Sequence, residues 1–108
     1  ARVHHLVGAE EMAMMKPDAY LVNTSRAHII DMKALTNALA NQQIAGAAID
    51  VYDHEPVPAT DPLRNIPNLL MTPHIGYVTR ETMDIFYGET LDAVEAMIAG
   101  TPIRELMP

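Results

Sequence analysis

Three short apolar runs, each followed by polar residues, constrain the fold of this chain more than any other feature. They occupy residues 19–23, 44–51 and 69–71, and the first two read as continuously apolar rather than alternating. Such runs are typical of strands buried on both faces of a parallel sheet. Helix-type segments precede and separate them, so the order predicts an α/β fold with crossover connections. Three strands are few, and an all-parallel sheet needs helices on both faces, so this unit looks incomplete on its own.

Two short helices are expected before and after the first run. Residues 8–16 carry acids in the first turn and a lysine in the last, and Pro17 prevents continuation. Residues 32–41 follow Asp31, a good N-cap, and are rich in helix-forming residues. The residues expected to face the core are Met12, Met15, Leu35, Ala38 and Leu39.

A longer helix is predicted from about Thr79 to Ala99, closed by Gly100 and Pro102. Its apolar residues recur at spacings of three and four, which predicts a stripe buried against another surface. A proline-punctuated connection over residues 53–67 precedes the last apolar run, and connections of that length are usually functional or linkers. The stripe consists of Met83, Phe86, Tyr87, Leu91, Val94, Met97 and Ile98.

Composition excludes several classes of function. The 108 residues carry a formal net charge of −7 and no basic cluster, which argues against nucleic-acid or anionic-membrane partners. No apolar run approaches the roughly 18 residues that a membrane-spanning helix needs. The absence of cysteine excludes disulfides and cysteine-ligated zinc and fits a reducing compartment, so we expect a cytoplasmic protein.

Polar residues follow all three apolar runs, at Thr24 to Arg26, at Asp50 to Glu55 and at His74. If the strands are adjacent and parallel, these groups converge on one edge of the sheet, where open α/β sheets bind ligands. An arginine can bind a small carboxylate in two hydrogen bonds. A carboxylate beside a histidine orients the ring and favours its protonated form, which is a better acid toward a carbonyl oxygen. Together these groups suit carbonyl reduction.

Three motifs occur in order along the chain: MKPDAYLVNTSR at residues 15–26, GAAIDVYDHEP at 46–56 and TPHIGY at 72–77. Together they resemble the C-terminal part of the NAD(P)-binding domain of the D-isomer-specific 2-hydroxyacid dehydrogenases. The resemblance covers nearly the whole chain and implies a Rossmann-type sheet, of which residues 1–108 would form the second half. It also implies that the last helix and tail, about residues 79–108, reach a substrate domain outside this chain.

The resemblance implies hydride transfer between NAD or NADP and a small D-2-hydroxy acid or its 2-oxo acid. It assigns substrate carboxylate binding and carbonyl polarisation to Arg26, general acid/base catalysis to His74, and orientation of that histidine to Glu55. Asp50 matches the position that accepts a hydrogen bond from the nicotinamide carboxamide. The cofactor-binding set that the resemblance implies is Thr24, Asp50, His74 and Gly76.

The chain also departs from the family pattern. No G-x-G-x-x-G turn and no following ribose-binding acid occur, so we expect the isolated chain to be inactive. Ala27 stands where the family usually has glycine; a positive φ there would cost on the order of 1 kcal/mol and could shift Arg26. His4, His5, His28 and His54 lack motif support and are interpreted as solvated or structural, without metal-ligand spacing.

Two alternatives to a dehydrogenase stay open. The chain could be a non-catalytic remnant that serves as a folding or dimerisation module through the apolar stripe of its last helix, so a homodimer also stays open. A hydrolase built on Ser25, Glu55 and His74 is the weaker alternative, because no nucleophile-elbow glycine pattern surrounds the serine.

Overall fold

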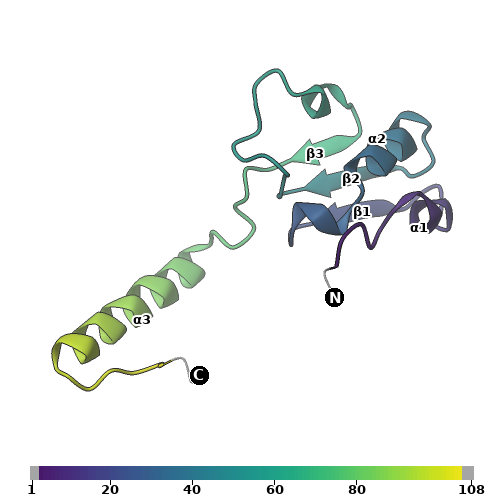
Figure 1. Ribbon diagram of the computed structural model, residues 1–108. Coiled ribbons are helices and arrows are strands. Elements are labelled where there is room, and N and C mark those ends of the chain that lie inside the picture. The colour runs from purple at the N-terminus through teal and green to yellow at the C-terminus, as the bar shows by residue number, and fades with distance from the viewer. Residues whose placement is uncertain (1–2, 106–108) are drawn as a thin grey trace. The chain divides into compact units, whose positions relative to one another are not determined.

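The computed structural model describes residues 3–105 and divides into two compact units, residues 1–76 and residues 77–108 (Figure 1). The predicted order of helices and strands is confirmed, with two additional 3-10 turns. The predicted tail includes residues 106–108, which lie outside the described residues. The first unit contains α1 (Ala9–Ala13), β1 (Tyr20–Asn23), η1 (Ala27–Ile29), α2 (Met32–Ala40), β2 (Gly46–Ile49), η2 (Pro62–Asn65) and β3 (Leu69–Met71), and the second contains α3 (Arg80–Ile98).

The three strands form a parallel sheet, as predicted, and their order in the sheet is β1, β2, β3. Tyr20 of β1 lies opposite Gly46 of β2, and Ala47 of β2 lies opposite Leu69 of β3. All three strands therefore end at the same edge of the sheet. Val7 and Ile30 add an isolated parallel bridge beside the named strands.

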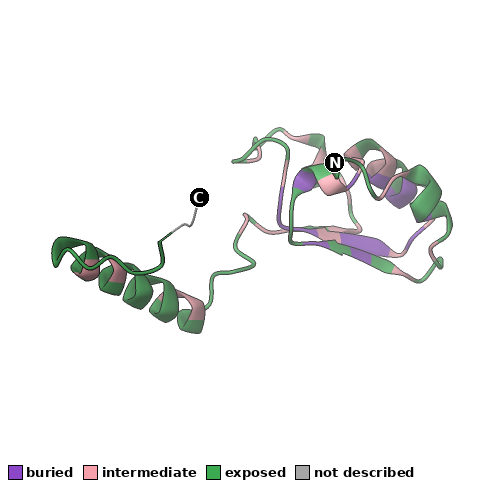
Figure 2. Ribbon diagram, turned by 60° about the horizontal axis from the view of Figure 1, so that its bottom comes forward, coloured by how far each residue is buried: buried purple, intermediate pink, exposed green. Residues whose placement is uncertain are grey.

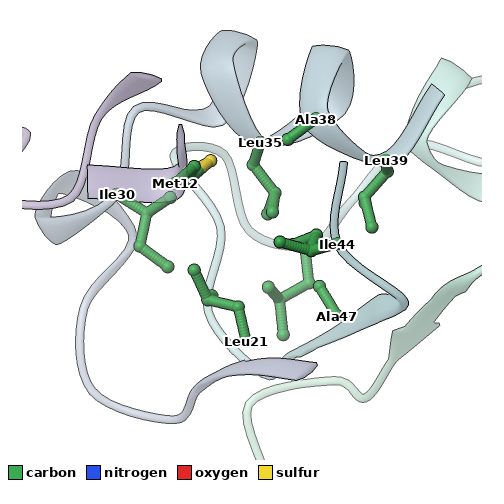
Figure 3. Close-up of a cluster of buried hydrophobic side chains, with 9 residues drawn as sticks. Met12, Leu21, Ile30, Leu35, Ala38, Leu39, Ile44 and Ala47 are labelled. Atoms are coloured by element: carbon green, nitrogen blue, oxygen red, sulfur yellow. The ribbon is translucent and has the colours of Figure 1, made fainter. Parts of the chain in front are cut away.

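The core lies between one face of the sheet and the two short helices (Figure 3). Met12 of α1 and Leu35 of α2 are fully buried, and they pack toward Leu21 of β1 and Ala47 of β2. Asp31 begins α2 as predicted, because its carboxylate accepts hydrogen bonds from the backbone N–H groups of residues 33 and 34. The predicted core-facing residues are confirmed, with Met15 partly buried at the margin.

The opposite face of the sheet differs from the sequence prediction. We predicted strands buried on both faces, but β1 alternates between exposed and buried residues. Tyr20 and Val22 of β1 and Leu70 of β3 are exposed on that side. The physical reason is that, among the described residues of the first unit, helices pack against one face only.

Predicted element boundaries also extend further than the observed ones. The helix α1 ends at Ala13 rather than at residue 16, because Met14 and Met15 turn tightly and donate to carbonyls three residues earlier. Lys16 therefore lies beyond the helix instead of in its last turn. The proline-rich connection contains η2, which Asp61 begins by accepting a hydrogen bond from the N–H of residue 63.

The second unit consists mainly of α3, which forms with nearly the predicted bounds. Thr79 caps its N-terminus by accepting a hydrogen bond from the N–H of Thr82. None of its residues is buried, so the expected burial of its apolar stripe is not found in the described residues (Figure 2). Across residues 3–105, no helix has the length and apolar character that crossing a membrane requires.

Gly46 is the glycine whose replacement should cost most. A Cβ there would lie 2.9 Å from the carbonyl oxygen of Asn68 and 3.0 Å from a ring carbon of Tyr20, so the backbone beside β3 and the Tyr20 ring would have to move. We expect Gly46→Ala to lower the free energy of unfolding by about 1–3 kcal/mol.

Gly88→Ala in α3 is the matched control, because a Cβ there meets open space and the backbone is helical. This variant should be neutral or should increase helix stability by up to about 1 kcal/mol. Urea unfolding followed by circular dichroism measures both variants. Equal stability of the wild type and Gly46→Ala would contradict the close approach.

Candidate active site

The carboxyl edge of the sheet brings together a carboxylate and the loop that follows β3. Asp50 comes directly after β2 and is only 2% exposed. Its Oδ1 accepts hydrogen bonds from the Thr72 hydroxyl at 2.5 Å and from the Ile75 N–H at 2.9 Å, and its Oδ2 accepts from the Gly76 N–H at 2.8 Å. One carboxylate therefore holds the loop over residues 72–76 at three points.

The hydrogen bonds to Asp50 favour its charged form. The Thr72 hydroxyl contributes most to lowering the pKa of Asp50, and the N–H groups of Ile75 and Gly76 and the charge of His74 add to it. Burial by itself raises the pKa of Asp50, but the hydrogen bonds outweigh it and the pKa is lowered. The carboxylate stays ionised at neutral pH, and charge-assisted bonds of this type are stronger than neutral ones.

His74 lies inside the loop that Asp50 holds, and its backbone is left-handed, with φ of 57°. For a residue other than glycine this conformation is strained and persists where the surroundings enforce it. The hydrogen bonds from the two residues after His74 to Asp50 supply that constraint. Strain of this kind is concentrated at functional sites.

Glu55 and His74 form a close pair, with 2.8 Å between Oε2 and Nδ1. The second oxygen of Glu55 accepts the Tyr52 N–H at 2.9 Å. The hydrogen bond to His74 is the largest cause of the lowered pKa of Glu55, followed by the N–H of Tyr52. Because an ionised carboxylate only accepts hydrogen bonds, Nδ1 carries the proton in this pair, and Nε2 is the ring nitrogen left to face other groups.

Arg26 follows β1 on a turn that the buried Asn23 shapes. The Asn23 side chain accepts the Ser25 N–H at 3.1 Å and donates to the Arg26 carbonyl at 3.0 Å. Arg26 also donates to the Ser25 carbonyl at 2.7 Å. Arg26, Glu55 and His74 line one cavity of about 230 Å³, as the convergence of strand ends predicted.

Ala27 creates no strain next to Arg26. It begins η1, a right-handed turn, and is absent from the residues with positive φ between residues 3 and 105. Arg26 itself has an extended backbone, with φ of −145°. The conditional cost that a positive φ would bring at Ala27 therefore does not arise.

The other predicted cofactor residues meet on the Asp50 side of this edge. A Cβ built on Gly76 would lie 3.1 Å from Asp50 Oδ2 and 3.6 Å from the Cβ of Thr24, so a side chain at this position would fill the space between them. Thr24 is exposed, and Gly76 has only hydrogen in that space. The three residues form a small cradle with one charged wall, the Asp50 carboxylate.

The remaining histidines do not join the site in a way that suggests metal binding. The rings of His4 and His5 lie 3.9 Å apart between centroids, and those of His4 and His28 lie 6.2 Å apart. His28 also lines the Arg26 cavity. Within the described part of the chain, no group of three or more potential ligands could hold a metal ion.

The sequence reasoning missed three residues that build the site, namely Asn23, Tyr52 and Thr72. Asn23 had a usable signal, because asparagine directly after an apolar run often closes a turn onto its own backbone. The hydroxyl bonds from Tyr52 to the Thr72 carbonyl and from Thr72 to Asp50 had no such signal, because they join residues 20 and 22 positions apart. Long-range hydrogen bonds of this kind leave no local pattern in a sequence.

An open parallel sheet with polar groups gathered at the carboxyl ends of its strands is a sheet of the Rossmann type, in which ligands bind at that edge. The sequence profile described as "D-isomer specific 2-hydroxyacid dehydrogenase, NAD binding domain" matches residues 1–76. The chain therefore belongs to the D-isomer-specific 2-hydroxyacid dehydrogenase family.

Individual proteins that are similar to the chain have names of the same kind. The chain is 42% identical over 98 residues to glyoxylate/hydroxypyruvate reductase B of Enterobacter agglomerans, covering 91% of this chain and 29% of the relative. It is 45% identical over 96 residues to the protein of the same name in Pectobacterium carotovorum, covering 89% and 29%. The crystal structure of D-lactate dehydrogenase with NAD+ from Lactobacillus jensenii superposes with a TM-score of 0.82 at 26% identity, over 98% of this chain and 36% of the other. The chain thus spans less than a third of the curated relatives' length.

The Asp50 contacts predict how stability depends on pH. Because the pKa of Asp50 is lower in the folded chain than in the unfolded one, its contribution is complete above the unfolded value of about 3.9 and is lost as pH falls through the folded value. Asp50→Asn replaces one acceptor oxygen by a donor, so an N–H of the loop loses its partner. We expect lower stability at pH 7 and a shallower loss of stability in acid.

Urea unfolding at a series of pH values between 2 and 7 measures this effect. Asp53→Asn is the control, because Asp53 is exposed and three residues away in the same segment. A parallel acid dependence in the wild type and Asp50→Asn would show that Asp50 does not hold the loop.

Proposed function

We propose that the chain forms the catalytic half of the nucleotide-binding domain of an NAD- or NADP-dependent D-2-hydroxyacid dehydrogenase. The overall reaction is reduction of a 2-oxo acid by NAD(P)H and a proton, giving the D-2-hydroxy acid and NAD(P)+, or its reverse. The observation that carries the proposal is the Glu55–His74 pair, with 2.8 Å between Oε2 and Nδ1, in a cavity that Arg26 also lines. Family membership supports the same reaction class.

In this proposal His74 moves the proton. Its Nδ1–H points at Glu55, so Nε2 is the atom that gives a proton to the substrate oxygen during reduction and takes it back during oxidation. The negative charge of Glu55 stabilises the imidazolium that the reverse reaction forms. The left-handed backbone fixes where the ring stands, so little rearrangement is needed at the moment of transfer.

Arg26 would bind the substrate carboxylate. Its guanidinium is always charged and can hold two carboxylate oxygens at once, which orients the adjacent carbonyl toward His74. The cavity of about 230 Å³ suits a small acid. The names of the relatives make glyoxylate and hydroxypyruvate the first substrates to test.

Thr24, Asp50 and Gly76 would hold the nicotinamide. An ionised carboxylate has about four acceptor sites, and the loop uses three on Asp50, so one is left for a carboxamide N–H. Gly76 keeps the adjacent space clear. The reduced nicotinamide, when bound, supplies the hydride.

A chimera tests this proposal. We would replace the matching segment of glyoxylate/hydroxypyruvate reductase B by this chain and measure NADH- and NADPH-dependent reduction of glyoxylate and hydroxypyruvate. We expect an active enzyme in which His74→Gln lowers kcat by at least about 100-fold, because glutamine can bond to Glu55 but cannot exchange a proton.

His54→Gln is the matched control, since His54 is exposed and has no motif support, and its activity should stay unchanged. A chimera that folds and reduces neither substrate would contradict the proposal. So would a chimera in which both histidine variants behave alike.

The second candidate function is a non-catalytic module that dimerises through α3. The exposed apolar residues of α3, including Phe86 at 53%, Leu91 at 62% and Ile98 at 80%, support it. This candidate predicts a dimer in analytical ultracentrifugation that Leu91→Glu dissociates, together with no saturable change when NADH fluorescence is titrated with the chain.

The dehydrogenase proposal predicts a different outcome for the isolated chain. We expect weak saturable NADH binding through the Thr24, Asp50 and Gly76 cradle but no turnover, because the chain contains no Gly-rich phosphate-binding turn. Reduction of glyoxylate by the isolated chain, lost in His74→Ala, would disprove the expected lack of turnover.

A further inference from the structure

Tyr52 contacts one member of the candidate catalytic pair, Glu55, and also the segment that leads to the other member, His74. Its backbone N–H donates to Glu55 Oε1 at 2.9 Å, which leaves Oε2 to face His74. Its hydroxyl lies 2.8 Å from the Thr72 carbonyl and 3.0 Å from the Ile49 carbonyl. Tyr52 therefore contacts Glu55 through its backbone N–H, and through its hydroxyl it contacts the segment that leads to His74.

The hydroxyl proton of Tyr52 has a preferred acceptor. A phenol has one proton, so it donates to one carbonyl at a time. The Ile49 carbonyl already accepts the Thr72 N–H at 3.0 Å, whereas the Thr72 carbonyl lies at the shorter distance from the phenol. The phenol thus ties the end of β2 to Thr72, two residues before His74.

The surroundings keep this phenol protonated. Burial raises the pKa of Tyr52, and the negative charge of Asp50 adds to the effect. Glu55 acts in the same direction, and the Thr72 carbonyl and Arg64 act against it. The ring packs against the margin of the core, so the hydroxyl is held in place rather than free to rotate away.

Tyr52 also lines two cavities that contain the pair. One is the Arg26 cavity, and the other has a volume of about 460 Å³ and includes Pro56 and Arg64 in its lining. Glu55 and His74 line both as well. A shift of the phenol would therefore change the surroundings of the pair in both cavities.

We propose that Tyr52 is a positioning residue that sets the contact between Glu55 and His74 through its hydroxyl bond to the Thr72 carbonyl. The inference rests on the proposed function, in which that pair moves the proton. Tyr52 touches neither substrate nor cofactor in this account. It fixes where the loop carrying His74 leaves β3, while its N–H fixes Glu55.

Tyr52→Phe tests the role of the hydroxyl, because it keeps the ring and removes only the oxygen. The readout is the pKa of Glu55 in the full chain, followed by carbon-13 NMR of its side-chain carboxyl across a pH series. In the wild type the pKa of Glu55 lies below its ordinary value because of His74. In Tyr52→Phe we expect it to rise by about half a unit or more, because the contact with His74 lengthens.

Tyr20→Phe is the matched control, since Tyr20 is 72% exposed on the other side of the sheet. Asp31 is an internal reference, because its pKa is lowered by the N–H groups at the start of α2, away from the site. Tyr20→Phe should leave both values unchanged, and Tyr52→Phe should leave Asp31 unchanged. An unchanged pKa of Glu55 in Tyr52→Phe, or an equal shift of Asp31, would overturn the proposal.

A measurement on the unaltered chain keeps the proposal testable if Tyr52→Phe does not fold. The Tyr52 hydroxyl proton should exchange slowly with water and show a nuclear Overhauser effect to Pro73. Absence of such a protected proton would overturn the proposal. Neither measurement needs cofactor or substrate, so failure here would leave the chimera result unaffected, and failure of the chimera would leave the Tyr52 contact intact.

Discussion

The buried carboxylate of Asp50 is the interaction on which the candidate site depends. It stands where β2 ends, and it holds the loop after β3 through the Thr72 hydroxyl and two backbone N–H groups. Its own N–H donates to the Asn23 carbonyl at 3.0 Å, which links it to the end of β1 as well. The side chain and the backbone of this one residue therefore connect all three strand ends, and the left-handed His74 lies within the loop that they hold.

The apolar core and the polar site occupy different parts of the first unit. The core is made by apolar residues of α1, α2 and one sheet face (Figure 3), while the site is made by polar groups at the ends of the strands. Core packing sets the strand register, and the register decides which residues reach the edge together. Changes in the core therefore reach the site through the register and through the packing of Tyr52, whereas changes at Asp50 or Tyr52 act on it directly.

Much of this arrangement could be predicted from the sequence, for identifiable reasons. Helical spacing located Leu35 and Leu39 in the core, and apolar runs located the strands. Polar groups after those runs predicted that Arg26, Glu55 and His74 share an edge, and they line one cavity. Contacts such as the Tyr52 hydroxyl to Thr72, 20 residues apart, could not be predicted, because they depend on side-chain positions that only the assembled sheet defines.

The charges at this edge of the sheet decide how the proposed site would meet an anionic substrate. Asp50 and Glu55 place two negative charges near His74, and both have lowered pKa values, so both stay ionised at neutral pH. An anionic 2-oxo acid entering such a site is repelled unless positive charge meets it. In the proposed function Arg26 supplies this positive charge, because it lines the same cavity as Glu55 and His74. The proposal therefore needs the arginine together with the histidine–carboxylate pair, since the two carboxylates alone would repel the acid.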